Sequence, residues 1–442
     1  MNSPKKDGND DVPVKDPVKY GELVILGSPE RTAIYCSVLI SLSVSRYNGS
    51  LPSGDRGRRK SRFALYRRAK ANGVKPSAVH ILNTPQDSKA VHSRGQHSIS
   101  FTLSRNQTVV VEYCHDNSTD MFQIGRSTES PIDFVVTDTS GGGTEGDDPS
   151  IAPSTISRFA CRVVCERNPP YTTRIYAAGF DSSKNIFLGE KATKWKNPDG
   201  HMDGLTTNGV LVMHPEGFPQ DPKQGLWREI SVCGDVYALR ETRSGPSRGK
   251  LVKGESSALR DGSLVDLCGA TLLWRTGEGL MRAPTLRHLE ALRQELNASR
   301  PQCPVGLSTL AFPSLPRKRQ PWVYLTCGHV HGRHDWGQRS ERVEDPGEGE
   351  GSTKRRECPL CRSVGPYVPL WLGSEPAVYV DAGAPSHAFV PCGHVCSERT
   401  AKYWAETPLP HGTHAFRPVC PFCSAALSTP GWIRLIFQGP ID

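Results

Sequence analysis

From Tyr20 to Arg282 the chain alternates short apolar runs with turn residues. Typical runs are GELVILG, CSVLISLSV, HSISFTL, QTVVVEY, RFACRVVCE, GVLVMH and DLCGATLLWR. Runs of about four to eight residues, rich in Val, Ile, Thr and Tyr, are typical of strands at the spacing of a β-sandwich. No sustained helical period interrupts them. The pattern predicts a mainly β fold, a β-sandwich with insertions, over residues 20–282.

One later segment has a different period. In APTLRHLEALRQELNASRP (Ala283–Pro301), Leu286, Leu289, Leu292 and Leu296 fall on one helical face. Pro284 suits a first helical turn and Pro301 ends the helix. The pattern predicts a linker helix over residues 283–301, joining the sandwich to a further domain over 302–442. A dimerising coiled coil is the alternative, although the segment is shorter than three heptads, and the oligomeric state stays open.

Composition and charge narrow the class of protein. The 442 residues exceed one ordinary core, and 42 Gly with 36 Pro indicate many turns. The net charge of +9 permits an acidic partner but does not demand nucleic acid. The polar residues 1–19 are expected to be flexible and have no signal-peptide core, and no apolar run is long enough to span a membrane. We therefore expect a soluble cytoplasmic protein whose cysteines stay reduced.

Several polar segments predict loops. These are a basic run (Gly54–Arg62), a Gly-rich acidic connection (Ser140–Ser150), a Pro/Gly-punctuated stretch (His214–Gly225) and a charged insertion (Arg342–Glu357). The insertion interrupts a cysteine-rich tail.

That tail holds the clearest chemistry in the sequence. Eight of the 14 cysteines lie from Cys303 onward, where CGH and CP-x-C motifs alternate twice. Zinc takes four ligands, usually thiolates and imidazoles, and the motifs supply two complete sets. Because no position is left open for water, the two zinc ions should be structural. The predicted ligands are Cys327, His329, Cys358, Cys361, Cys392, His394, Cys420 and Cys423.

The order of the motifs does not decide which pairs share an ion. Consecutive pairing would make tandem zinc sites, and interleaved pairing would join the first pair to the third. Cys396 could replace Cys392 or His394, although its counterpart in the first repeat is His331. The other donors that lie close in sequence are Cys303, His331, His334, His411 and His414.

This array, with QCPVGLSTLAFPS before it and PLPHGTHAF within it, closely resembles the RING-like domain of the Pellino proteins, and the likeness extends from KYGELVILG to RLIFQGP. Pellino proteins are RING-type E3 ubiquitin ligases, so the resemblance implies ligase activity without a covalent enzyme–ubiquitin intermediate. It implies an E2 ubiquitin-conjugating enzyme as a partner, with Leu360, Val395 and Phe422 as E2-facing residues. Because zinc ligands in RING domains are interleaved, the resemblance also favours interleaved pairing here.

The family also carries a forkhead-associated (FHA) domain, a β-sandwich with an inserted wing that reads phosphothreonine. Its landmarks match FQIGRS, ISRFACRV and LTTNGVLV. An arginine binds phosphate through charge-assisted hydrogen bonds, and hydroxyl and amide groups add further hydrogen bonds. Ala160 stands where FHA domains usually have a histidine that buttresses the site, so this chain departs from the family pattern at that position. The implied phosphothreonine-binding residues are Arg126, Ser157, Arg158, Thr207 and Asn208.

The leading hypothesis is therefore a phosphothreonine-guided E3 ligase. By resemblance its partners are phosphorylated interleukin-1-receptor-associated kinases, in Toll-like and interleukin-1 receptor signalling. A phospho-dependent adaptor without ligase activity is the alternative. A zinc-finger protein that binds nucleic acid is disfavoured, because the tail has no basic recognition helix and no aromatic residues alternating with Lys or Arg.

Overall fold

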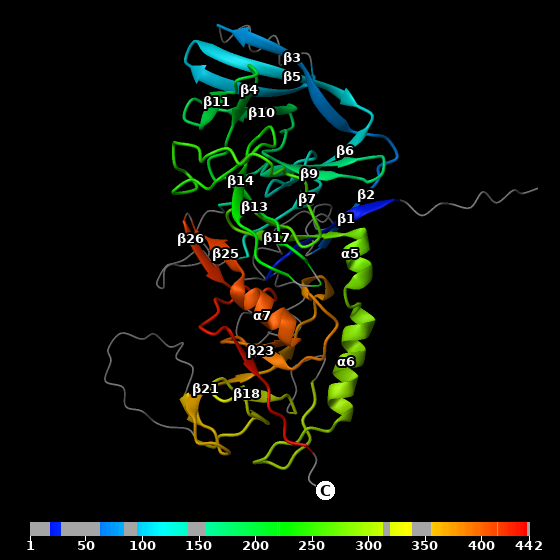
Figure 1. Ribbon diagram of the computed structural model, residues 1–442, viewed down its shortest axis with the longest axis vertical. Coiled ribbons are helices and arrows are strands. Elements are labelled where there is room, and N and C mark those ends of the chain that lie inside the picture. Colours follow the sequence, from blue (N-terminus) through cyan, green and yellow to red (C-terminus); the bar gives the residue numbers. More distant parts are fainter. Residues whose placement is uncertain are drawn as a thin grey trace, which may run out of the picture.

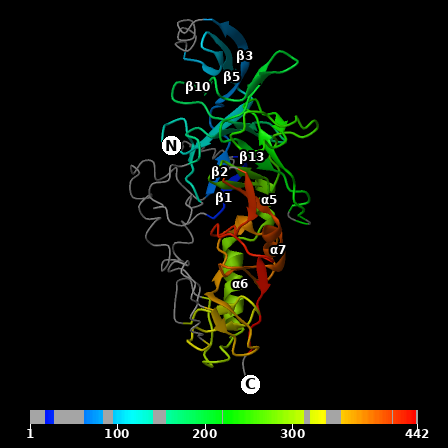
Figure 2. The same ribbon diagram turned by 90° about the vertical axis from the view of Figure 1, so that its left-hand side faces the viewer.

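The computed structural model describes residues 18–27, 62–83, 95–139, 155–218, 220, 222–312, 319–337, 355–412 and 414–439. The expected flexible N-terminus (residues 1–17), the run CSVLISLSV and the loop segments at 54–61, 140–150 and 342–354 lie outside these residues. The described chain is elongated (Figure 1), with a wing of strands at one end, a sandwich in the middle and the cysteine-rich region at the other end. The side view in Figure 2 shows the same succession.

Two sheets form the sandwich. The larger has the strand order β15-β14-β13-β16-β17-β1-β2, and the smaller β7-β6-β8-β9. Both contribute to one apolar core, in which Trp274 of β17 and Val163 of β8 are buried. The mainly β prediction is confirmed. The larger sheet comprises β1 (Lys19–Ile25), β2 (Arg62–Tyr66), β13 (Val210–Met213), β14 (Trp227–Ile230), β15 (Val236–Tyr237), β16 (Leu264–Asp266) and β17 (Thr271–Thr276). The smaller comprises β6 (Thr119–Gly125), β7 (Phe134–Val135), β8 (Cys161–Glu166) and β9 (Thr173–Ala177).

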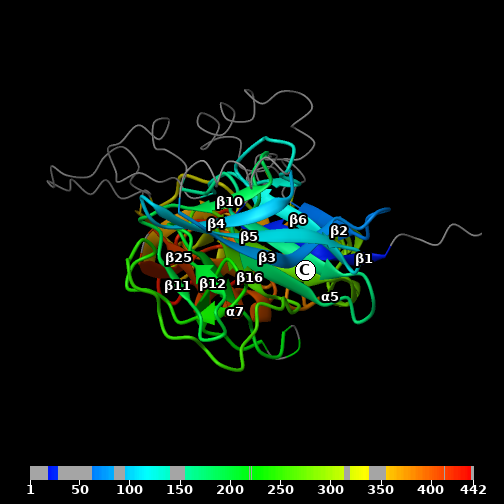
Figure 3. The ribbon, with the colours of Figure 1, turned by 90° about the horizontal axis from the view of Figure 1, so that it is seen from above.

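A third sheet forms the wing, in the order β10-β4-β5-β3. Its strands lie in front of the rest of the molecule when it is viewed from above (Figure 3). They are β3 (Gly73–Leu82), β4 (His97–Ser104), β5 (Gln107–Asp116) and β10 (Asn185–Leu188), with the small hairpin β11 (Lys194–Lys196) and β12 (Met202–Gly204) following.

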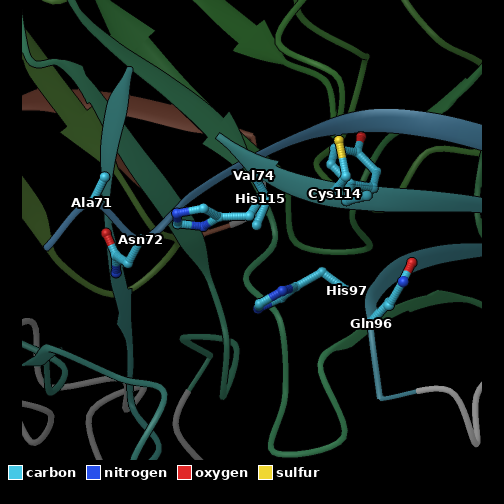
Figure 4. Close-up of a pocket in the computed structure, with 8 residues that line it drawn as sticks. Ala71, Asn72, Val74, Gln96, His97, Cys114 and His115 are labelled. Carbon is cyan, nitrogen blue, oxygen red and sulfur yellow. The ribbon is translucent and has the colours of Figure 1, made fainter. Parts of the chain in front are cut away.

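The wing contains a hollow of ≈ 460 Å³, lined by residues that include Asn72, His97, Cys114 and His115 (Figure 4). Burial lowers the pKa of His97 to about 4, so this imidazole is neutral near neutral pH. None of the residues expected to bind phosphothreonine lines the hollow.

The linker region holds two helices, α5 (Gly277–Arg282) and α6 (Leu286–Ala298). Ala283 between them is extended, with ψ of 154°, because the residue before a proline disfavours helical backbone. Thr285 caps α6 by accepting a hydrogen bond of 3.1 Å from the His288 N–H. Leu289 and Leu292 are buried, whereas Leu286 is 52% exposed, so only part of the predicted leucine face is covered. Among the described residues, no helix is long and apolar enough to cross a membrane.

The cysteine-rich region consists of two small sheets, a hairpin and a helix. One sheet has the order β19-β18-β21-β20 and the other β22-β24-β23-β27. The first comprises β18 (Trp322–Tyr324), β19 (Val330–His331), β20 (Arg355–Glu357) and β21 (Val364–Pro369). The second comprises β22 (Trp371–Leu372), β23 (His387–Phe389), β24 (His394–Cys396) and β27 (Trp432–Arg434). The other elements are a 3-10 turn (Pro376–Val378), α7 (Glu398–Glu406) and the hairpin β25 (Pro408–His411) and β26 (Ala415–Pro418).

An apolar cluster joins this region to the sandwich. It contains Leu211 and Leu273 of the larger sheet, Leu292 of α6, and Tyr379 and Trp404 of the cysteine-rich region. Polar contacts also cross the junction: the Trp227 indole N–H donates to the Pro408 carbonyl over 2.9 Å, and the Gly27 N–H donates to the Pro421 carbonyl over 2.8 Å. The outer face of the larger sheet is thus packed against the cysteine-rich region.

Candidate metal centres and phosphothreonine-binding surface

The first metal-type group is Cys327, His329, Cys358 and Cys361, whose ligand atoms all lie within 4.8 Å of one another. The Cys-Gly-His turn follows β18, and Gly328 occupies it with φ of 77°, a conformation that favours glycine. The Gly328 N–H donates to the Tyr324 carbonyl over 2.8 Å, which closes the turn. The local backbone therefore brings the first sulfur and the imidazole to the same side.

The second half of this group comes from a tight knuckle between β20 and β21. The Cys358 N–H donates to the Ser363 carbonyl and the Arg362 N–H donates to the Cys358 carbonyl, each over 2.8 Å. Arg362 has φ of 63°, which turns the chain sharply after the second cysteine. This geometry points both sulfurs of the knuckle toward one ion.

The second group, Cys392, His394, Cys420 and Cys423, repeats the plan. Gly393 has φ of 76° and its N–H donates to the Phe389 carbonyl over 2.8 Å. In the knuckle, the Cys420 N–H donates to the Ala425 carbonyl and the Ser424 N–H to the Cys420 carbonyl, again over 2.8 Å. The two halves of the region are copies of one motif.

The expectation of interleaved pairing is wrong. Each Cys-Gly-His turn meets the CP-x-C knuckle that follows it in the chain, so the arrangement is consecutive. The reason is strand pairing: β18 pairs antiparallel with β21, with Tyr324 opposite Tyr367. This register brings the turn after β18 and the knuckle before β21 to the same end of one sheet.

The two halves are nevertheless interlocked through their strands. Trp371, which follows the first half, pairs in parallel with His394 of the second, and Ile436, which follows the second, pairs with His329 of the first. A Cβ at Gly328 would lie 2.1 Å from the Arg434 carbonyl oxygen, and one at Gly393 would lie 2.3 Å from that of Pro369. Only glycine permits these close approaches.

The thiols within each group differ in the direction in which their pKa is shifted. Burial raises the pKa of Cys327 to about 12. Burial also raises the pKa of Cys361, but hydrogen bonds with Ser363 outweigh it and lower the pKa to about 6. In the second group, burial raises the pKa of Cys420, whereas hydrogen bonds with Cys392 and Cys420 lower that of Cys423. Three close sulfurs cannot all be thiolates without a positive ion between them.

Each group thus fits one zinc ion. Three sulfurs and one imidazole complete a tetrahedron and leave no position open, so these zinc ions are structural. When bound, each zinc ion cross-links a Cys-Gly-His turn to a CP-x-C knuckle, two loops that have little apolar core of their own.

The three residues expected to face an E2 enzyme differ in exposure. Leu360, in the first knuckle, is 48% exposed. Val395 is fully buried and Phe422 is 6% exposed, because both pack inside the region, Phe422 against Tyr379 and His394. Only Leu360 of the three is available to a partner.

The landmark segments around Arg126 and Ser157 lie side by side in the sandwich. The Arg126 N–H donates to the Ser157 carbonyl over 3.2 Å, and the Ser127 N–H donates to the Arg158 carbonyl over 3.1 Å. The side chains of Arg126 and Arg158 are exposed and that of Ser157 is half-buried. Ala160 is buried, and its N–H donates to the Ile124 carbonyl over 2.9 Å.

The third landmark adjoins the second. The Asn208 side-chain amide donates to the carbonyl of Thr155, two residues before Ser157, and Thr207 next to it is exposed. All five predicted side chains therefore belong to three adjoining loops at one edge of the sandwich.

Sequence reasoning missed the buried ion pairs beneath the third loop. Arg243 pairs with Asp266 and donates to the Asn208 carbonyl over 3.1 Å. Arg240 pairs with Glu229 at 2.6 Å and donates to the Thr206 carbonyl over 3.0 Å. Both arginines occur in a polar stretch, and nothing in its pattern signals burial.

Of the additional donors, Cys303, His331 and His334 form a third group within 4.8 Å. Cys396, His411 and His414 belong to none of the metal-type groups found among the described residues.

Comparison with known proteins agrees with this architecture. The family models described as "Pellino, FHA domain" and "Pellino, RING domain" match residues 11–292 and 296–442. The chain is 67% identical over 437 residues to the human E3 ubiquitin-protein ligase pellino homolog 2, covering 97% of each chain. It is 64% identical to the human pellino homolog 3 over 98% of this chain and 93% of the relative. It is 53% identical to Protein pellino of Drosophila melanogaster over 99% of this chain and 96% of the relative.

The FHA sandwich and the two zinc-type centres define an E3 ubiquitin-protein ligase of the RING class. This chain combines a RING domain, the type that binds E2 enzymes, with an FHA domain, the type that binds phosphorylated partners. The chain belongs to the Pellino family.

Proposed function

We propose that this ligase selects a partner bearing phosphothreonine through Arg126, Ser157, Arg158, Thr207 and Asn208. The observation that carries the proposal is the convergence of their three loops, held together by backbone and amide hydrogen bonds. Two exposed guanidinium groups border a surface that also offers two hydroxyl groups, a donor set suited to a phosphate dianion. The Asn208 side-chain amide, which donates to the Thr155 carbonyl, ties the third loop to the second.

The buried pairs beneath the third loop support this role. Arg240 and Arg243 hold the carbonyls of Thr206 and Asn208, so the loop does not have to be ordered when the phosphopeptide binds. A pre-ordered loop lowers the entropic cost of binding. We assign these arginines a positioning role.

As partners of the phosphate site we propose phosphorylated interleukin-1-receptor-associated kinases, in Toll-like and interleukin-1 receptor signalling. Membership of the Pellino family supports this choice. A cytoplasmic location belongs to the same proposal, since it keeps the thiol ligands of both metal centres reduced.

The transfer step needs no nucleophile from this chain. Zinc is bound by Cys327, His329, Cys358 and Cys361 in one centre, and by Cys392, His394, Cys420 and Cys423 in the other. The resulting rigid surface, with Leu360 exposed on it, holds an E2 enzyme so that its ubiquitin thioester meets a lysine of the partner. Such catalysis acts through proximity and orientation.

A reconstituted reaction tests the proposal. The zinc-loaded chain is incubated with a panel of E2 enzymes, ubiquitin and a phosphorylated or dephosphorylated interleukin-1-receptor-associated kinase. Ubiquitin chains should form on the phosphorylated kinase and be much reduced on the dephosphorylated one. Equal modification of both forms would contradict phosphate-guided selection.

Variants separate the two sites. Arg126→Ala should abolish phosphopeptide binding while unanchored ubiquitin chains still form, and Arg105→Ala, an exposed arginine of the wing, is the matched control. Leu360→Ala should abolish the synthesis of ubiquitin chains while phosphopeptide binding is kept. A phosphopeptide that binds without any chain synthesis by any E2 would instead favour the adaptor role.

A further inference from the structure

We propose that the RING region binds a third zinc ion, held by Cys303, His331 and His334. The ligand atoms of these three residues lie within 4.8 Å of one another, as in the two groups of four. They come from two places: Cys303 follows helix α6, whereas His331 and His334 follow the first Cys-Gly-His turn. The site would therefore join the end of the linker to the RING region.

The backbone around Cys303 has the shape of a zinc knuckle. The Cys303 N–H donates to the Ser308 carbonyl over 2.9 Å, and the Leu307 N–H donates to the Cys303 carbonyl over 2.8 Å. The same two bonds occur at the same spacing in the knuckles that begin at Cys358 and Cys420. Leu307 has φ of 48°, matching the left-handed residues Arg362 and Ser424 of those knuckles.

The sequence of this segment explains why it escapes a motif search. It reads CPVGLS, where the other knuckles read CPLCRS and CPFCSA. Gly306 stands at the position of the second cysteine, and its N–H donates to the Cys303 sulfur over 3.3 Å. This knuckle therefore offers one cysteine sulfur where the other two knuckles offer a pair.

The two imidazoles present unpaired nitrogens at the same place. His331 is fully buried, and its Nδ1 has no hydrogen-bond partner. Both ring nitrogens of His334 are buried and also without a partner. Leaving such groups unpaired is costly in free energy, and a metal ion would satisfy one nitrogen of each ring.

The packing keeps the donors together. Gly332, between the two histidines, lies against Cys303, since a Cβ there would be 3.5 Å from its sulfur. The Tyr324 ring packs edge-on against His331, with ring centroids 5.1 Å apart. One thiolate and two imidazoles are typical zinc donors, and with three protein ligands the fourth position is left to water.

The site adjoins the first centre but is separate from it. The Cys358 sulfur lies 3.7 Å from His329 Nδ1 and 3.8 Å from His331 Nε2. If His331 instead served the first centre in place of His329, the chain would hold only two zinc ions. Counting the metal therefore distinguishes the two arrangements.

Native mass spectrometry of the full chain, purified without chelators, provides the count. We expect three zinc ions in the wild type, two in Cys303→Ser and two in His334→Gln. Cys396→Ser is the matched control, since this buried cysteine belongs to no metal-type group, and should keep three. Two zinc ions in the wild type, or an unchanged count in Cys303→Ser, would overturn the proposal.

X-ray absorption at the zinc edge keeps the proposal testable if the cysteine variant does not fold. With both four-ligand centres filled alone, each zinc has three sulfur ligands on average. Filling the third site lowers this average in the wild type and raises the share of nitrogen and oxygen. An average of three sulfurs per zinc in the wild type would refute the third site.

A designed gain of ligand gives a further test. A Cβ at Gly306 would lie 3.8 Å from the Cys303 sulfur and meet no atom closer than 3.7 Å, so a side chain fits. Gly306→Cys should complete the knuckle and slow the chelator-driven release of one zinc ion, whereas Gly306→Ser should not. Equal release from both variants would contradict the assignment.

Discussion

The FHA sandwich and the RING region differ in what stabilises them. The sandwich has a continuous apolar core drawn from both of its sheets and the wing, including Phe101, Phe134 and Trp274. The buried apolar side chains of the RING region are divided among smaller clusters, two of which lie around its own strands. Two of its large, fully buried side chains, Trp404 and Tyr379, belong to the cluster shared with the sandwich. The first domain is held by apolar burial, and the second by metal ligands and by its neighbour.

The two metal centres also differ in their exposure and in their contact with the sandwich. Cys361 and Leu360 of the first centre are exposed, whereas Cys420 and Phe422 of the second are buried in the shared cluster. The carbonyl of Pro421 accepts the hydrogen bond from Gly27 at the end of β1. The second centre is therefore part of the junction, and the first is the one open to partners.

The largest effect should come from removing the metal. A strong chelator should unfold the RING region while the sandwich stays folded, because structural zinc supplies about 10–16 kcal/mol in zinc-finger peptides. Hydrogen exchange followed by mass spectrometry should show lost protection in β18, β21, β23 and β24, with β6 and β8 still protected. Uniform loss across the chain would show that the sandwich has no independent stability.

Single ligand replacements should rank the two centres. Cys420→Ser should lower the free energy of unfolding by more than about 4 kcal/mol, since it removes a metal and opens the shared cluster. Cys361→Ser should leave the second half of the RING region and the sandwich protected. Thermal unfolding measures the stability of each variant, and hydrogen exchange shows which segments lose protection. Loss of protection in the same segments of both variants would contradict the ranking.

The shared cluster can be weakened without touching a ligand. Leu292→Ala should cost about 2–5 kcal/mol, because Leu292 of α6 is buried between the two regions. Denaturant unfolding measures the loss. Leu286→Ala, at an exposed position of the same helix, is the control and should change stability by less than about 0.5 kcal/mol.

The smallest effect should come from the helix cap. Thr285→Ala should cost about 1 kcal/mol by removing the acceptor for the His288 N–H, and Thr285→Ser should restore most of it. The same unfolding measurement applies. No difference between the alanine and serine variants would mean that the cap contributes nothing to the position of α6.

Much of the chain could be predicted because the relevant signals are local. Strand-length runs of β-branched residues indicated a mainly β fold, and Cys-Gly-His and CP-x-C motifs indicated metal ligands, since two or three neighbouring residues suffice to aim both donors. The extended backbone at Ala283 is likewise a local effect of Pro284, and α6 therefore begins at Leu286, inside the predicted range 283–301.

Other features depend on contacts between residues far apart in sequence. Which turn meets which knuckle follows from the pairing of β18 with β21, and a motif of three residues carries no information about that register. The burial of Val395 and Phe422, the support of the Asn208 loop by Arg243, and the meeting of Cys303 with His331 likewise arise from packing. Residue types and short spacings determine which side chains can act as metal ligands or bind phosphate. Strand pairing between residues far apart in sequence determines which of these side chains come within bonding distance.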